Sequence, residues 1–286
     1  MQTADSALTP MDTEMENTSP PSPAKAPVNP VLAATIMLLR DDRGALEVFM
    51  VQRHHQIDFA TGALVFPGGK TDPADREPAL RPHCPGCEGL DDEALALRVS
   101  AVRETFEECG VLVARARGEQ TLLPESRVRP LETAHRADLL AGRYTMRDLV
   151  EQHGLELATD VLVPFAHWIT PDFMPKRFDT WFYLVPAPED QVAAHDGEES
   201  VDSVWVKPAD AIAEAKAGRR TIIFPTLNNL MKLARSSSVE EAIHRARTEP
   251  LVTVLPTVHK TEAGKVLRIT PEAGYELNEV PMEGRP

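Results

Sequence analysis

The chain has 286 residues, of which 42% are hydrophobic and 26% charged, and its net charge is −14. This length can bury one large core or two ordinary ones, and the composition is that of a soluble globular protein. No apolar run is long enough to span a membrane, and the acidic, proline-rich start lacks the apolar core of a secretory signal. The negative charge disfavours general nucleic-acid binding, and three cysteines make no disulfide framework. These observations predict a cytoplasmic protein that binds no membrane.

The first third of the chain predicts a tail, three strands and a loop. Residues 1–29 carry prolines among polar and acidic residues, so we expect a disordered tail. The apolar run 31–39 predicts a buried strand, which a turn joins to a second strand over 46–51. A third strand is expected over 62–66, and the segment at about 76–91 has the composition of a loop inserted between regular elements.

A long amphipathic helix is predicted from Asp91 or Asp92 to Cys109, with an aspartate at its start and Gly110 after its end. At about 100° per residue, its apolar side chains share one face, while three glutamates share the opposite face. The apolar face consists of Leu95, Val99, Val102, Phe106 and Cys109, and the acidic face of Glu104, Glu107 and Glu108.

The rest of the chain predicts further strands at 160–169, 180–185 and 201–206, helices at 208–217, 225–234 and 239–247, and a last hairpin around 262–265. The alternation of strands and helices predicts an α/β fold with a central mixed sheet and helices outside it. One domain is expected over residues 30–270, with appended helices at about 225–248 and a C-terminal tail over 271–286.

The three glutamates have the spacing i, i+3, i+4, which projects them from the helix as one cluster. Without a cation they would repel one another, whereas Mg²⁺ or Mn²⁺ prefers such oxygen ligands and can bridge phosphate oxygens. Upstream, Pro67-Gly68-Gly69 can bring the backbone close to the cluster, where a side chain would obstruct a diphosphate. The pattern indicates a metal-dependent site for a phosphorylated small molecule.

These residues resemble a known motif. Residues 103–111, Arg-Glu-Thr-Phe-Glu-Glu-Cys-Gly-Val, are similar to the second half of the Nudix box, G-x5-E-x7-R-E-U-x-E-E-x-G-U, where U is aliphatic. Residues 66–75 resemble its opening, with Gly69 on the first glycine and Asp75 where the glutamate is expected. The chain departs from the pattern by an insertion between the two halves and by Thr105 at a usual aliphatic position.

The resemblance to Nudix hydrolases implies an α/β/α sandwich whose Nudix box carries the insertion, and hydrolysis of a diphosphate linkage. It implies metal ligation by Glu104, Glu107 and Glu108 and an Arg103 that braces the loop against the helix, so these four are the candidate catalytic residues. Mg²⁺ or Mn²⁺ would be the cofactor, and a nucleotide-type small molecule the substrate. A homodimer is expected only because many members of the family are dimers.

The substrate expectation also rests on resemblance. Gly68 to Asp75 resembles the coenzyme A diphosphatase branch, but Asp58 stands where that branch has a second arginine. The split box, residues 51–55 and residues 175–183 look more like the Nudix-19 type, which implies cleavage of CoA or acyl-CoA to 3′,5′-ADP and 4′-phosphopantetheine. The alternatives are an ADP-ribose or NADH pyrophosphatase, an enzyme that removes RNA caps, and a non-catalytic nucleotide sensor.

Several single residues have two interpretations each. Arg53, Lys70 and Arg177, with the backbone of Gly68 and Gly69, are candidates to bind substrate phosphates, although surface or salt-bridge roles fit the three cations equally well. Glu198 or Glu199 could be the general base or part of an acidic loop. Cys84 and Cys87 have the spacing of a zinc half-site without a second pair. The strand aromatics, Trp168, Trp181, Phe182 and Trp205, fit a core better than a platform for adenine.

Overall fold

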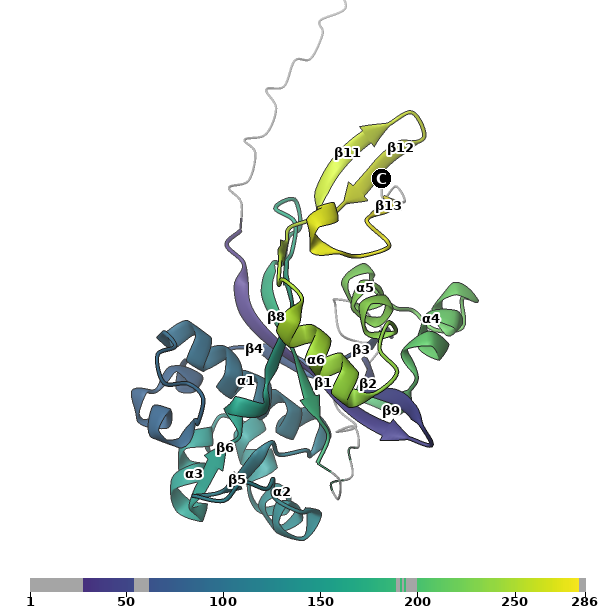
Figure 1. Cartoon of the computed structure of the whole chain (residues 1–286). Helices are drawn as coiled ribbons and strands as arrows, with labels where there is room; N and C mark the ends of the chain where they lie inside the picture. The colour runs from purple at the N-terminus through teal and green to yellow at the C-terminus, as the bar shows by residue number, and fades with distance from the viewer. Residues whose placement is uncertain (1–27, 54–61, 189–190, 192, 194–199, 283–286) are drawn as a thin grey trace, which may run out of the picture.

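A mixed eight-stranded sheet forms the centre of the computed structural model, which describes residues 28–53, 62–188, 191, 193 and 200–282 (Figure 1). The strand order is β10-β7-β8-β1-β2-β3, with β4 paired to β1 and β9 to β2. The β1–β8 and β7–β10 pairs are parallel and the others antiparallel. The strands are β1 (Val31–Asp42), β2 (Ala45–Arg53), β3 (Leu64–Val65), β4 (Gly68–Lys70), β7 (Val163–Ile169), β8 (Phe178–Pro186), β9 (Ser200–Val206) and β10 (Thr253–Val254).

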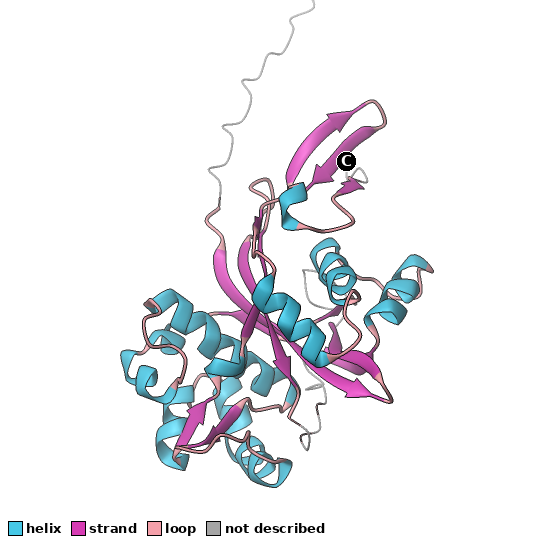
Figure 2. Ribbon diagram, viewed as in Figure 1, coloured by secondary structure: helices cyan, strands magenta, loops and turns pink. Residues whose placement is uncertain are grey.

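Helices cover both faces of this sheet (Figure 2). Successive side chains of a strand point to opposite faces, so a strand buried on both sides is apolar at nearly every position. In β1, Ile36 and Leu38 join the core cluster under α1 (Asp92–Cys109), α2 (Glu125–Leu140) and α3 (Met146–His153). Met37 and Leu39 join the cluster under α4 (Pro208–Lys216), α5 (Phe224–Leu233) and α6 (Val239–Thr248).

Helix α1 begins and ends where the sequence predicts. The Asp91 side chain accepts a hydrogen bond from the backbone N–H of Ala94 at 2.8 Å, and Gly110 closes the helix in the left-handed conformation. All five residues predicted for the apolar face are buried in one cluster. The acidic face also lies against protein, because Glu107 and Glu108 are only 6% and 7% exposed.

Two smaller sheets complete the fold. The strands β5 (Ala114–Ala116) and β6 (Leu155–Leu157) pair beside α3, and β11 (Thr257–Thr261), β12 (Gly264–Arg268) and β13 (Glu279–Pro281) form a sheet that projects from the body. Four short 3₁₀ turns are η1 (Pro73–Arg76), η2 (Pro78–His83), η3 (Thr159–Val161) and η4 (Pro271–Ala273). The C-terminal sheet lies beyond the strand ends of the central sheet (Figure 1).

The α/β class, the mixed sheet and the last hairpin are confirmed. The segment predicted as a loop insertion contains the 3₁₀ turn η2, whose Leu80 is fully buried in the core. The segment from residue 271 was predicted to be a C-terminal tail. Instead it contains η4, and its strand β13 pairs with β12. Helices α2 and α3 were not expected at all. Most of the predicted N-terminal tail, 1–27, lies outside the described residues.

In the part of the chain that the structure describes, every helix is too short or too polar to cross a membrane.

Candidate active site

The site is built where β4 passes over α1. β4 is a short antiparallel partner of β1, with Gly68 opposite Thr35 and Gly69 opposite Ala34. The backbone N–H of Gly68 donates to Glu108 Oε2 at 3.1 Å. A Cβ on Gly69 would lie 2.5 Å from the carboxylate of Glu104. The glycine pair therefore lets the backbone approach two of the three glutamates.

Arg103 joins the loop and the helix. Its Nε and Nη2 donate to the two carboxylate oxygens of Asp75, each at 3.0 Å, and Nη2 also donates to the carbonyl of Lys70 at 2.9 Å. Its Nη1 donates to Glu104 Oε1 at 2.9 Å and to Glu107 Oε2 at 2.7 Å. Such a planar fork is suited to bidentate carboxylate pairing. The two halves of the split motif are thus held together by one guanidinium.

Negative charge is in excess around that guanidinium. Three carboxylates, those of Asp75, Glu104 and Glu107, lie within 3.0 Å of Arg103. Burial, with a smaller contribution from the neighbouring charge of Glu107, raises the pKa of Glu104 to about 7 against the opposing effect of Arg103. A buried group of this kind gains stability from additional positive charge.

The donor set fits a hard divalent cation. Glu104, Glu107 and Glu108 supply carboxylate oxygens only, and Mg²⁺ or Mn²⁺ prefers these ligands. In the described residues, no three acidic, histidine or cysteine side chains converge closely enough to hold a metal as they stand. Glu104 and Glu107 point instead to Arg103. Their side chains would have to turn from Arg103 toward an ion, and that change would relieve the charge excess.

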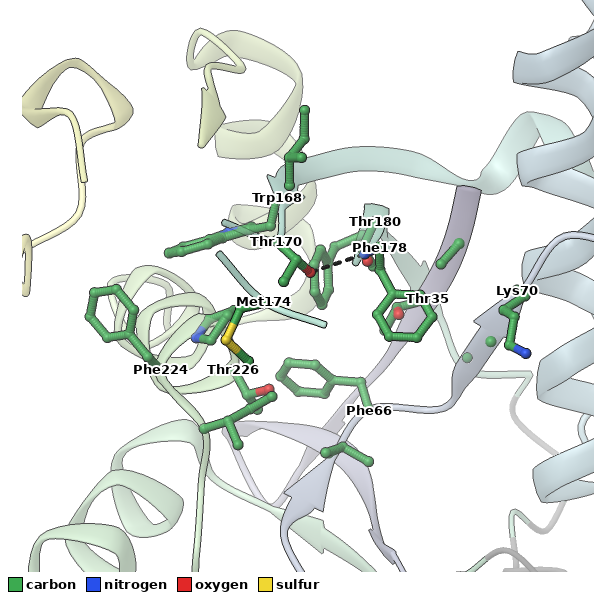
Figure 3. Close-up of a pocket in the computed structure, with 18 of the residues that line it drawn as sticks. Thr35, Phe66, Lys70, Trp168, Thr170, Met174, Phe178, Thr180, Phe224 and Thr226 are labelled. Atoms are coloured by element: carbon green, nitrogen blue, oxygen red, sulfur yellow. Dashed lines mark hydrogen bonds between the residues drawn. The ribbon is translucent and has the colours of Figure 1, made fainter. Parts of the chain in front are cut away.

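A cavity of about 870 Å³ opens beside the glutamates, a size within the range of small-molecule sites. Its polar lining includes Glu104, Glu108, Lys70 and Arg53. Figure 3 shows two of its aromatic residues, Trp168 and Phe224, at the opposite side of the cavity from Lys70. The apolar lining includes Phe66, Trp168, Phe173, Met174, Phe178, Phe182, Ile223, Phe224, Pro225, Pro256, Leu267 and Met282. A ligand of mixed polarity fits this cavity.

The structure brings most of the predicted binding residues to this cavity. Arg53, Gly68, Gly69 and Lys70 all line it. The buried Nε of Arg53 has no hydrogen-bond partner within the described parts of the chain.

Other candidates lie elsewhere. Arg177 is not part of the cavity lining, because its guanidinium donates to the carbonyls of Thr170 at 3.0 Å and Val28 at 2.8 Å. It fastens the start of β1 to the β7–β8 turn. Glu107 lies behind the lining at its ion pair with Arg103. Glu198 and Glu199 fall outside the described residues.

The aromatic residues divide between core and cavity. Trp168 and Phe182 line the cavity, whereas Trp181 and Trp205 pack against the cluster on the opposite face of the sheet. Sequence reasoning missed Phe178 and Thr180 as lining residues. The signal was present, because residues 178, 180 and 182 alternate along β8 and must share one face.

The two cysteines of the C-x2-C segment are core residues. Cys84 and Cys87 are 1% and 0% exposed, and the Cys87 thiol hydrogen-bonds to Thr159 Oγ1 at 3.4 Å. Burial raises the pKa of the Cys84 thiol to about 12. Both side chains therefore act as small hydrophobic groups that hold η2 against the body.

Comparison with known proteins gives the same family as the motif. The profile of the NUDT19 Nudix domain matches residues 87–233, just over half of the chain. A Caenorhabditis elegans protein named as a nudix hydrolase is 30% identical over 188 residues, which cover 66% of this chain and 56% of that protein. The human protein named acyl-coenzyme A diphosphatase NUDT19 is 28% identical over 267 residues, 77% of this chain and 69% of the human protein.

A solved structure indicates the same family. The crystal structure of a Nudix hydrolase from Alicyclobacillus acidocaldarius matches with a TM-score of 0.62 at 28% identity, covering 77% of this chain and 97% of the other. The chain belongs to the Nudix hydrolase family. Within that family its Nudix domain is of the NUDT19 type. It spans between about half and two thirds of the length of the curated relatives that it matches.

Proposed function

We propose that this protein hydrolyses the diphosphate linkage of CoA or an acyl-CoA, with water, to 3′,5′-ADP and 4′-phosphopantetheine or its acyl thioester. The observation that carries the proposal is the mixed polarity of one cavity, whose lining combines glutamates and cations with many aromatic and aliphatic side chains, and in which Trp168 and Phe224 lie opposite Lys70. CoA has the same division between a charged nucleotide diphosphate and a less polar arm. The relatives named acyl-CoA diphosphatases support the same substrate class.

Glu104, Glu107 and Glu108 are the residues that would hold Mg²⁺ or Mn²⁺. When bound, the cation would supply charge neutralisation at the diphosphate and activation of the attacking water. Arg103 would keep the glutamate helix and the loop in register, because it contacts Asp75 and the Lys70 carbonyl on the loop side. Positioning of this kind accounts for a large share of catalysis in phosphate chemistry.

The remaining polar residues of the cavity would bind and orient the diphosphate. Arg53 and Lys70 lie in the same lining as Glu104 and Glu108. Their charges would meet phosphate oxygens, and the buried Arg53 Nε would gain an acceptor that the described residues do not offer it. The glycine pair would leave room for a phosphate above α1.

The proposal is tested by product analysis on a panel of CoA, acetyl-CoA, ADP-ribose, NADH and capped RNA, each with Mg²⁺ or Mn²⁺. We expect release of 3′,5′-ADP from CoA and acetyl-CoA. Glu108→Gln should lower kcat by about 10²–10³-fold, the range seen when one electrostatic contact to the transition state is lost. The variant keeps an oxygen that can accept the Gly68 N–H.

Glu93→Gln is the matched control, because Glu93 is an exposed residue of the first turn of the same helix. It should retain wild-type activity. Cleavage of ADP-ribose or NADH without cleavage of CoA would leave the metal chemistry in place and contradict the CoA assignment. Nucleotide binding without cleavage of any substrate would support a sensor instead.

A further inference from the structure

The chain beyond the matched Nudix domain takes part in the cavity. The family match ends at residue 233, yet Pro256, Leu267 and Met282 line the same cavity as Glu104. Pro256 follows β10 and Leu267 belongs to β12 of the projecting C-terminal sheet. A segment appended to the domain therefore forms one wall of the candidate active site.

This wall is fixed to the body by a buried chain of hydrogen bonds. The Trp168 indole Nε1 donates to the Tyr275 hydroxyl at 3.1 Å, and that hydroxyl donates to Asn229 Oδ1 at 2.8 Å. Tyr275 is 8% exposed and Asn229 is fully buried. Because Trp168 itself lines the cavity, Tyr275 sets the place of the C-terminal segment relative to the site.

The wall continues outward as an apolar surface. A second depression shares Phe173, Pro256 and Met282 with the main cavity and is also lined by Leu255 and Val258, with Asp172, Thr257 and Lys265 as its polar members. Phe173 and Leu255 are each 47% exposed, and Val258 is 39% exposed, so they are among the most exposed large apolar side chains in the described parts of the chain. We call these residues the apolar track: Phe173, Leu255, Pro256, Val258, Leu267 and Met282.

The side chains of the track select the chemical class of its occupant. All six are apolar, so a purine base there would lose water from its ring nitrogens and amino group without gaining partners from these side chains. An aliphatic chain has no such polar groups, and each methylene that it buries strengthens binding by roughly a factor of four. The shared lining of the two depressions gives such a chain a path from the site to the projecting sheet.

We propose that the C-terminal segment, residues 253–282, is a specificity element and that its apolar track receives the fatty acyl chain of an acyl-CoA substrate. This inference rests on the proposed function, because it assigns the distal part of that substrate. The diphosphate would lie at the glutamates, the pantetheine arm in the aromatic cavity, and the acyl chain along the track.

The test compares kcat/KM for CoA, acetyl-CoA, octanoyl-CoA and palmitoyl-CoA in the full chain and in Leu255→Asp. Leu255 is half-exposed, so the substitution should leave folding intact, while its carboxylate makes the track unfavourable for a hydrocarbon. We expect kcat/KM to fall at least tenfold for octanoyl- and palmitoyl-CoA and to stay within twofold for CoA and acetyl-CoA. Leu140→Asp is the matched control, because Leu140 on α2 is 45% exposed and remote from the track.

A second measurement reads binding without turnover. In EDTA, calorimetry should give a lower Kd for octanoyl-CoA than for CoA in the wild type and in Leu140→Asp, and equal values in Leu255→Asp. If CoA compounds are cleaved but Leu255→Asp lowers all four values equally or changes none, the acyl assignment is overturned and the proposed function remains. If the wild type cleaves no CoA compound, the proposed function is overturned, and the acyl assignment fails with it.

Discussion

The contact between Asp75 and Arg103 offers a direct test of how the split motif is held together. Asp75 is 1% exposed and accepts both hydrogen bonds of the guanidinium fork at 3.0 Å. It also accepts from the backbone N–H of Asp72 at 2.7 Å. Asp75→Asn keeps the shape but removes the charge and one acceptor. Breaking a buried ion pair costs about 3–5 kcal/mol when the partner is left alone.

The expected cost is smaller here because Arg103 keeps two other carboxylate partners, Glu104 and Glu107. We therefore expect Asp75→Asn to lower the free energy of unfolding by about 2–3 kcal/mol, near the value of one charged hydrogen bond in a buried site. Urea unfolding with an unchanged m-value measures this quantity. Activity should fall as well, since the loop that carries Lys70 loses its tie to α1.

Asp92→Asn serves as the matched control. Asp92 pairs with Arg81 at 2.9 Å, but its side chain is 76% exposed. An exposed pair of this kind contributes less than about 1 kcal/mol. Equal losses of unfolding free energy in the two variants, within about 0.5 kcal/mol, would refute the view that Arg103 and Asp75 hold the two halves together.

Three further outcomes are expected. Gly69→Ala should reduce activity about 100-fold with little change in unfolding free energy, because its Cβ would displace the flexible Glu104 carboxylate 2.5 Å away. In Gly142→Ala the new Cβ would meet open space but the backbone is left-handed, so this variant should keep its activity and lose unfolding free energy. If the two variants changed activity and unfolding free energy alike, this reasoning would be contradicted. Tyr275→Phe should lower the free energy of unfolding in urea by about 1–3 kcal/mol, because it leaves buried polar atoms unpaired. An unchanged urea midpoint would contradict the role of Tyr275 in holding the C-terminal segment. At pH 8 the Cys84 thiol should resist alkylation until the protein unfolds, because a pKa of about 12 leaves very little thiolate; labelling of the native protein within minutes would exclude that burial.

The arrangement of the glutamates could be predicted from the sequence because all three lie on one regular element, helix α1. Helical spacing fixes which side chains of α1 share a face, so Glu104 and Phe106 could be assigned to opposite sides without tertiary information. The family motif implied that Arg103 braces the loop against the helix and placed Asp75 at its glutamate position, but it did not pair the two; the ion pair between them is a finding of the structure. Local patterns of this kind carry across an insertion, because the inserted residues 76–91 change neither end.

The shape of the cavity could not be predicted from the sequence. The aromatic end of the cavity joins β7, β8, α5 and the C-terminal sheet, which are far apart in the chain. Arg177 was a candidate to bind substrate phosphates, with a surface or salt-bridge role as the alternative, whereas in the fold its guanidinium donates to the carbonyls of Thr170 and Val28. Such contacts depend on long-range packing, which a period of 2 or 3.6 residues cannot encode.

This difference separates two kinds of functional residue. In the proposed function, the glutamates and glycines around α1 would contact the diphosphate, which all the candidate substrates share, so they indicate the reaction and not the molecule. Selection among these substrates would then come from groups that meet the rest of the ligand, and the cavity-lining residues Trp168, Phe224 and Leu267 are candidates for this role. Of these, Leu267 belongs to a segment outside the matched Nudix domain and is held in place through Tyr275. Substitutions along that segment should therefore change which substrate is cleaved, while substitutions on α1 should change whether any is cleaved.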